Sequence, residues 1–204
     1  MDYKQAIQNS FSVGENSITD NKYQTSFKYY MFDEEVWIVF RPTSTKLNWI
    51  MNFIFPLQRI PYGNNESPIR MHWGFLKGYK NYLRGELHKI VQENIGKKFI
   101  FTGHSLGGAL ARISGLDISW NYGIPIEIRS YASPRIGNRA FEESYKKRIG
   151  AKHYVTKDDI VPKVPCLWMG YGEYNKIVLK GTGRCFKDHY PATYFANTEE
   201  SIWT

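Results

Sequence analysis

The six residues from Gly103 to Gly108, with the sequence GHSLGG, constrain this chain more than any other stretch. They fit the pattern G-x-S-x-G, in which a serine occupies a sharp turn between a strand and a helix. Residues 98–102 are short, apolar and β-favouring, and residues 109–116 predict a helix that starts with small side chains. The flanking glycines would allow a strained backbone and a close approach of the helix to neighbouring strands. We therefore predict that Ser105 is a nucleophile; the alternative is a serine that only caps a helix.

The pattern of apolar residues predicts alternating strands and helices around this turn. The expected strands cover residues 23–32, 36–40, 98–102, 124–131 and 153–156. The expected helices cover residues 5–9, 75–95, 109–116 and 138–149. This alternation predicts the α/β class, with a mostly parallel central sheet flanked by helices on both faces. A length of 204 residues suits a single domain, 1–204.

The net charge of +8 leaves three kinds of partner to consider: nucleic acid, an anionic lipid surface, or none. The lysines and arginines are scattered, and the one small cluster, 146–148, ends a predicted helix, where cations are favoured in any case. No nucleic-acid-binding motif accompanies them, so we expect no nucleic-acid partner. A solvated basic surface is the simplest interpretation, and attraction to anionic lipid stays open.

The spacing of possible metal ligands and the hydropathy of the chain argue against a metal site, a transmembrane segment and a secretory signal. The chain has neither C-x-x-C nor H-E-x-x-H spacing and no acidic calcium loop, so we expect no metal. No apolar run approaches the roughly 20 residues that cross a bilayer, so we expect no transmembrane segment. The first residues lack the regions of a secretory signal, which predicts a cytoplasmic or leaderless chain.

A serine hydroxyl is a weak nucleophile until a base removes its proton, and that base needs an acid to hold its tautomer. The order along the chain for this kind of turn is serine, acid, histidine. His153 lies inside a predicted strand and is expected in the core, whereas His189 lies in a late loop and is favoured as the base. The acid should follow a strand end between Ser105 and His189. Asp158 and Asp159 do so; we favour Asp159 as the acid and Asp158 as a turn residue, with the reverse left open.

Four further side chains are expected in structural roles or are left open. His72 should hydrogen-bond neighbouring backbone at the start of a helix, and His104 should pack beside the sheet. Cys166 and Cys185 do not make a disulfide framework, and whether they pair cannot be decided from their positions in the chain.

The chain resembles a known family, the class 3 lipases, which include the filamentous-fungal triacylglycerol lipases. Seven blocks carry the resemblance in order: Ile38-Val39-Phe40-Arg41, Asn48-Trp49-Ile50, His72-Trp73-Gly74-Phe75, the G-H-S-L-G-G-A turn, Ala132 to Asn138, Asp159-Ile160-Val161-Pro162 and Asp188-His189. The resemblance implies an α/β-hydrolase fold with Ser105 as nucleophile, Asp159 as acid and His189 as base. It implies no cofactor.

The resemblance also bears on the oxyanion hole and on a lid. The backbone N–H of Leu106, directly after the nucleophile, is expected to be one donor. By resemblance, Thr43 supplies the second. The chain departs from the family at Pro42, where glycine is usual, and proline has a fixed φ and no N–H. The apolar segment around 44–56 lies where the family carries a lid; a fixed segment walling the pocket is the alternative.

Together these features predict a serine hydrolase that cleaves carboxylic esters of lipids, or other acyl esters, through an acyl-enzyme intermediate. A substrate at a lipid–water interface is one expectation. A phospholipase A1-type or feruloyl-type esterase with the same triad stays open. So does a catalytically silent hydrolase-like domain that binds a lipid or a partner. Oligomeric state and acyl-chain preference are not readable from the sequence.

Overall fold

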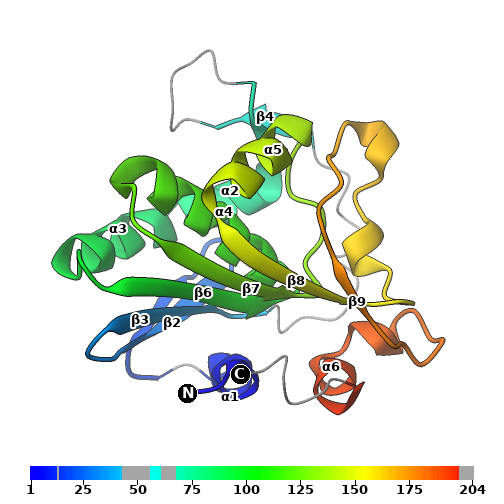
Figure 1. Ribbon diagram of the computed structural model, residues 1–204, viewed down its shortest axis with the longest axis horizontal. Coiled ribbons are helices and arrows are strands. Elements are labelled where there is room, and N and C mark those ends of the chain that lie inside the picture. Colours follow the sequence, from blue (N-terminus) through cyan, green and yellow to red (C-terminus); the bar gives the residue numbers. More distant parts are fainter. Residues whose placement is uncertain (13, 43–55, 61–67, 198–204) are drawn as a thin grey trace.

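A seven-stranded sheet forms the centre of the molecule in the computed structural model, which describes residues 1–12, 14–42, 56–60 and 68–197 (Figure 1). Its strand order is β1-β2-β3-β6-β7-β8-β9. The strands are β1 (Ser17–Asp20), β2 (Thr25–Met31), β3 (Glu35–Phe40), β6 (Lys98–His104), β7 (Ile126–Tyr131), β8 (Gly150–Thr156) and β9 (Ile177–Leu179). Strands β3, β6, β7, β8 and β9 run parallel, and β1 and β2 extend the sheet in antiparallel fashion. The expected mostly parallel sheet is therefore confirmed.

Helices cover both faces of this sheet. They are α1 (Tyr3–Ser10), α2 (Trp73–Lys80), α3 (Leu83–Glu93), α4 (Leu106–Tyr122), α5 (Arg139–Arg148) and α6 (Pro191–Asn197), with short 3-10 turns η2 (Val161–Lys163), η3 (Leu167–Met169) and η4 (Lys187–His189). Helices α2 to α5 lie on one face, and α1 and α6 lie on the other (Figure 1). A separate two-stranded ribbon pairs β4 (Leu57–Arg59) with β5 (Arg70–His72).

The alternation of side chains along β3 explains how one sheet serves two cores. Val36, Ile38 and Phe40 join the larger apolar cluster under α2 to α5. Trp37 and Val39 point the other way, into a smaller cluster with residues of α1 and α6. Successive side chains on a strand point to opposite faces, so a strand buried on both faces reads as a continuous apolar run.

The short strands β4 and β5 and the helix α6 were not expected from the sequence, and two further features differ from the expectation. The single helix expected over 75–95 is two helices, α2 and α3, separated at Asn81 and Tyr82. The Asn81 side chain donates to Asp20 at 2.9 Å, and Tyr82 has a φ of −134°, outside the helical range. The short outer strands β1 and β9 were not expected, because neither carries a long apolar run. The segment 44–56 proposed as a lid lies outside the described residues, except for Pro56.

Candidate active site

Ser105 occupies a strained turn between β6 and α4. Its φ of 56° and ψ of −120° are far from the regions that residues with a side chain usually adopt. Flanking hydrogen bonds hold this conformation: the Ser105 N–H donates to the Tyr131 carbonyl at 2.9 Å, and the Ala109 N–H donates to the Ser105 carbonyl at 3.1 Å. Strain of this kind costs on the order of 1–3 kcal/mol and persists only where surrounding structure enforces it. The Ser105 side chain makes no capping hydrogen bond to the helix that it starts.

The glycines beside Ser105 are required by close packing. A Cβ on Gly103 would lie 2.4 Å from the carbonyl carbon of Gly107, and a Cβ on Gly107 would lie 2.3 Å from the carbonyl oxygen of Phe40. Both distances are impossible for real atoms. The expected close approach of helix and strands is therefore confirmed. Neither glycine has a positive φ, and the strained residue of the turn is Ser105 itself.

The structure brings Ser105, His189 and Asp159 into one hydrogen-bonded chain. The Oγ of Ser105 lies 2.9 Å from Nε2 of His189, and Nδ1 of His189 lies 3.0 Å from Oδ2 of Asp159. The three come from different elements: the turn after β6, the turn after β8 and η4. Ser105 and His189 are 4% and 8% exposed, and Asp159 is fully buried. This is the arrangement of a nucleophile, a base and the acid that orients the base.

The carboxylate of Asp159 has two further donors. The Val161 N–H donates to Oδ1 at 2.8 Å, and the Tyr194 hydroxyl donates to Oδ2 at 3.0 Å. The same hydroxyl accepts from the Thr156 N–H at 3.0 Å. Burial, together with the charge of Asp159, raises the pKa of Tyr194 well above its usual value, so this side chain stays a neutral donor. Sequence reasoning missed Tyr194, because no motif links a tyrosine in the last helix to an acid in a distant turn.

Asp158 does not take the place of Asp159. It is only partly buried, and the nearest carboxylate to the His189 imidazole is that of Asp159. The loop that carries His189 is fixed by its own contacts: the Thr156 hydroxyl donates to the carbonyl of Asp188 at 2.9 Å, and the Asp188 carboxylate accepts from the Thr182 N–H at 2.8 Å. The loop that carries His189 is therefore held in place from both β8 and the segment before η4.

His104 packs directly against the imidazole of His189, with ring centroids 5.0 Å apart. It is 3% exposed. Burial, followed by the charge of His189, lowers the pKa of His104 well below its usual value of 6.5. His104 therefore stays neutral near pH 7 and places no positive charge beside His189.

One of the two expected oxyanion donors can be located. Leu106 is the first residue of α4, so its N–H has no partner within the helix and belongs to the set of free donors at a helix N-terminus. It directly follows Ser105, where developing negative charge would be accepted. Thr43, the other expected donor, lies outside the described residues. Pro42 is described and buried.

The other singled-out side chains have structural partners. His72 caps α2 by accepting from the Phe75 N–H at 3.3 Å, and His153 is buried with its Nδ1 2.7 Å from the Ser130 hydroxyl. Both agree with expectation. Cys166 and Cys185 are free thiols, which answers the open question of their pairing.

Two properties of the described residues bear on metal binding and on membrane insertion. No group of three or more His, Cys, Asp or Glu side chains among them is arranged to hold a metal ion. Within the same part of the chain, every helix is too short or too polar to span a bilayer.

Comparison with known proteins shows which family this chain resembles. The family model described as lipase (class 3) matches residues 37–168. Secreted mono- and diacylglycerol lipase 1 of Fusarium solani is 31% identical over 142 residues, which are 68% of this chain and 41% of that protein. Phospholipase A(1) DAD1, chloroplastic, of Arabidopsis thaliana is 31% identical over 153 residues, 64% of this chain and 34% of that protein. The chain thus spans less than half the length of either relative.

Solved structures show the same fold. A triacylglycerol lipase whose catalytic centre is formed by a serine protease triad superposes with a TM-score of 0.74 at 24% identity, covering 87% of this chain and 77% of that one. The lipase from Rhizopus microsporus var. chinensis gives a TM-score of 0.69 at 26% identity, covering 80% and 60%. The expected α/β-hydrolase fold is confirmed.

Proposed function

Since the chain belongs to the class 3 lipase family, we propose that it is a serine hydrolase that cleaves carboxylic esters of lipids through an acyl-enzyme intermediate. The observation that carries this proposal is the continuous chain of contacts from Ser105 through His189 to Asp159, with separations of 2.9 and 3.0 Å. These separations are within the reach that proton transfer requires.

In the first half of the reaction, Nε2 of His189 takes the proton of Ser105 as Oγ attacks the ester carbonyl. The negative charge that develops on the carbonyl oxygen is accepted by the Leu106 N–H, and in this proposal by Thr43 as well. His189 then gives its proton to the departing alcohol, and the acyl group remains on Ser105.

In the second half, His189 takes a proton from water, which attacks the acyl carbonyl and releases the fatty acid. His189 then returns the proton to Ser105. Asp159 keeps Nδ1 of His189 protonated throughout and stabilises the imidazolium that forms twice in each cycle. The Val161 N–H and the Tyr194 hydroxyl hold this carboxylate, so it has little freedom to turn away.

The substrate class is the next step of the proposal. One matched relative is a mono- and diacylglycerol lipase and another is a phospholipase A1, which favours acyl esters of glycerol in both cases. The relatives support acylglycerols as the first candidate and the acyl chains of phospholipids as the second. The triad itself serves either, because the chemistry at the carbonyl is the same.

The test measures hydrolysis of p-nitrophenyl esters from acetate to palmitate, followed by diacylglycerol, triacylglycerol and phosphatidylcholine. We expect turnover of esters by the unsubstituted chain and a loss of about 10⁴-fold or more in Ser105→Ala, which retains its folded circular dichroism spectrum. Equal activity in Ser105→Ala would refute the assignment. Absence of turnover by the unsubstituted chain on every ester would favour the silent, binding-only alternative.

A further inference from the structure

The direction of the Asp159 carboxylate depends on the turn that follows it. Oδ1 of Asp159 accepts from the Val161 N–H at 2.8 Å, and Val161 is the first residue of η2. The Val164 N–H closes the turn by donating to the Val161 carbonyl at 3.1 Å. A shift of η2 would therefore move the carboxylate of the catalytic acid with it.

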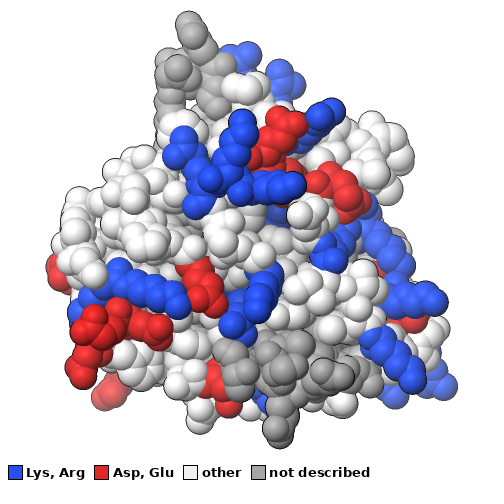
Figure 2. Space-filling model, viewed as in Figure 1, with Lys and Arg blue, Asp and Glu red and all other residues white. Residues whose placement is uncertain are grey.

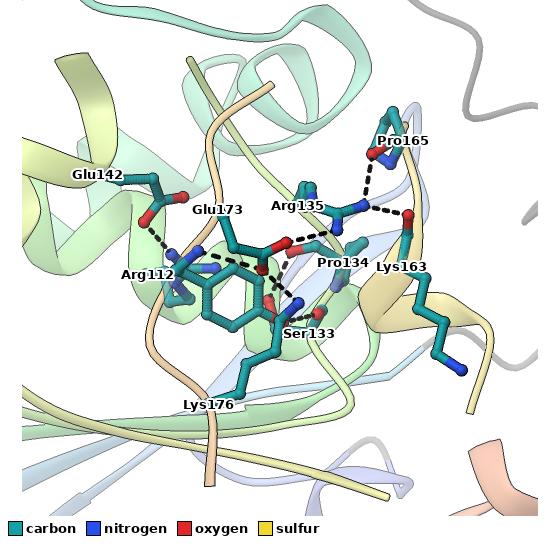
Figure 3. A network of polar contacts seen from close by, with 10 residues as sticks. Arg112, Ser133, Pro134, Arg135, Glu142, Lys163, Pro165, Glu173 and Lys176 are labelled. Atoms are coloured by element: carbon teal, nitrogen blue, oxygen red, sulfur yellow. Dashed lines mark hydrogen bonds and ion pairs between the residues drawn. The ribbon is translucent and has the colours of Figure 1, made fainter. Parts of the chain in front are cut away.

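Arg135, in the loop after β7, holds the end of this turn. Its backbone N–H donates to the Val164 carbonyl at 2.9 Å. Its Nη1 donates to the carbonyl oxygens of Lys163 and Pro165, the second at 3.0 Å (Figure 3). One residue thus binds three consecutive carbonyl groups. Carbonyl groups at the end of a helical turn have no partner within that turn, so these contacts fix where η2 ends.

The other side of the Arg135 guanidinium is fixed by Glu173. Nη2 donates to Oε2 of Glu173 at 2.6 Å, and Lys176 donates to the second oxygen of the same carboxylate (Figure 3). A guanidinium is planar and its donors point in fixed directions, so it can bond a carboxylate and backbone carbonyls at the same time. The side chain is therefore held on both sides.

The loop that carries Arg135 also packs against the helix of the nucleophile. A Cβ on Gly108, the third residue of α4, would lie 3.2 Å from the Cβ of Ser133. The Tyr174 hydroxyl donates to the Ser133 carbonyl, which fixes this end of the loop as well. The short loop 133–135 thus contacts the start of the nucleophile helix and the turn after the acid, and it sets the spacing between them.

Burial of Arg135 is uncommon for a charged side chain. Lysine and arginine side chains stand on the surface of the face drawn in Figure 2, whereas Arg135 is 7% exposed. Among the described residues, its Nε has no hydrogen-bond partner. A buried ion pair with an unpaired N–H contributes little net stability, because desolvation offsets the attraction. The contacts of Arg135 supply a fixed position more than they supply stability.

We propose that Arg135 is a positioning residue for the catalytic acid. By holding the carbonyl groups at the end of η2, it keeps the Val161 N–H on Oδ1 of Asp159, so that Oδ2 stays directed at Nδ1 of His189. It acts through Asp159, because the hydrogen bonds of its guanidinium go to backbone carbonyls and to Glu173. This role rests on the proposed function, since it lies within that reaction.

The first measurement is the hydrolysis of p-nitrophenyl butyrate by Arg135→Gln, with kcat and KM determined separately. A displacement of about 1 Å at a reacting group can cost about 10²-fold in rate, so kcat should fall by about that factor while KM changes by less than about threefold. Arg135→Met, an apolar side chain of similar length, is the second variant and carries the same expectation. Arg135→Lys keeps a donor but loses the planar fork, so its kcat should lie between those of Arg135→Gln and the unsubstituted protein.

Arg84→Gln is the matched control. Arg84, on α3, is also paired with a buried carboxylate, that of Asp117 at 2.8 Å, but it has no contact with the turn after the acid. This variant should lower the melting temperature and leave kcat within about twofold. All rates are compared at a temperature where circular dichroism shows each variant to be folded.

A cycle of substitutions separates action through Asp159 from a general loss of stability. In an Asp159→Asn background the carboxylate is already absent, so adding Arg135→Gln should slow the reaction by less than about threefold. A purely structural role would give the same fold-loss in both backgrounds. The rate in these slow variants is followed as covalent labelling of Ser105 by diethyl p-nitrophenyl phosphate.

Proton NMR gives a readout that needs no substrate. The Nδ1 proton of His189, hydrogen-bonded to Asp159, should give a resolved downfield resonance in the unsubstituted protein and in Arg84→Gln, and should be lost to exchange in Arg135→Gln. The proposal is overturned if a folded Arg135→Gln or Arg135→Met keeps kcat within about threefold and keeps the resonance. Equal fold-losses in the two backgrounds would also overturn it.

The same measurements distinguish this proposal from the proposed function. Ester turnover that is unaffected by removal of the guanidinium refutes the positioning role and leaves the proposed function standing. A His189 resonance that depends on Arg135, in a chain that hydrolyses no ester, supports the positioning role and refutes the proposed function.

Discussion

Replacing Asp159 by asparagine removes one charge and almost no volume, and the surrounding donors make the consequence specific. The carboxylate accepts from the Val161 N–H at 2.8 Å, from Tyr194 at 3.0 Å and from His189 at 3.0 Å. An amide has one acceptor oxygen where the carboxylate has two. If that oxygen stays with Val161, the new NH₂ group faces His189, which must then carry its proton on Nε2.

An imidazole with its proton on Nε2 donates to Ser105 and cannot accept from it, so the base is lost. The other amide orientation sets an NH₂ group against the Val161 N–H in a buried site, where the unmatched donors cost about 1–3 kcal/mol. We therefore expect Asp159→Asn to lower kcat by about 10⁴-fold. This corresponds to about 5 kcal/mol of lost transition-state stabilisation.

The assay is the steady-state hydrolysis of p-nitrophenyl butyrate, with kcat and KM determined separately. KM should change little, because the carboxylate does not touch the substrate. Asp158→Asn is the matched control: its side chain is only partly buried and lies outside the triad, so kcat should stay within about threefold. The reasoning would be refuted if Asp158→Asn lost more activity than Asp159→Asn, or if Asp159→Asn kept more than about a tenth of kcat.

Three further predictions concern the stability of the fold, and the first of them also concerns the catalytic rate. Tyr194→Phe removes a donor from the catalytic carboxylate and an acceptor from a buried N–H; urea unfolding should show a loss of about 1–3 kcal/mol, and kcat should fall with it. Gly107→Ala, whose Cβ would lie 2.3 Å from a backbone oxygen, should lower the free energy of unfolding by about 3 kcal/mol or more. Gly85→Ala, which has open space inside α3, should raise the free energy of unfolding by up to about 1 kcal/mol, and thermal melting of both variants checks this. Burial lowers the pKa of both His104 and His153 well below 6.5, so the unfolded chain binds more protons in acid than the folded protein does. The stability present above pH 6.5 should therefore fall as the pH drops below that value, and urea titrations across this range should show a weaker pH dependence in His153→Gln than in the unsubstituted protein.

The part of the site that the sequence predicted is the part encoded locally. The turn at Ser105 needs small residues at fixed positions on either side, and the steric reason is now visible in the distances at Gly103 and Gly107. The order serine, acid, histidine is typical of a nucleophile on this kind of strand–turn–helix, which is why Asp159 and His189 could be chosen from the sequence.

The parts of the fold and of the site that the sequence did not predict depend on long-range contacts, which leave no local sequence pattern. Tyr194 reaches Asp159 across 35 residues, and nothing around it in the chain signals that contact. The break between α2 and α3 lies beside a hydrogen bond from Asn81 to Asp20 in another element, and periodicity does not register such a contact. The sequence predicted a strained turn at this place, but only the tertiary structure shows that the positive φ falls on Ser105 itself. Thr43 and the lid around 44–56 stay predictions, because they lie outside the described residues.

The central claim is that Ser105 is made nucleophilic by an imidazole that Asp159 holds in position. The most direct measurement is the rate at which diethyl p-nitrophenyl phosphate forms a covalent bond with the protein, with the labelled peptide located by mass spectrometry. We expect a single diethylphosphoryl group on Ser105, and a labelling rate that falls by several orders of magnitude in His189→Ala. A label on any other residue, or an unchanged rate without the imidazole, would contradict the account.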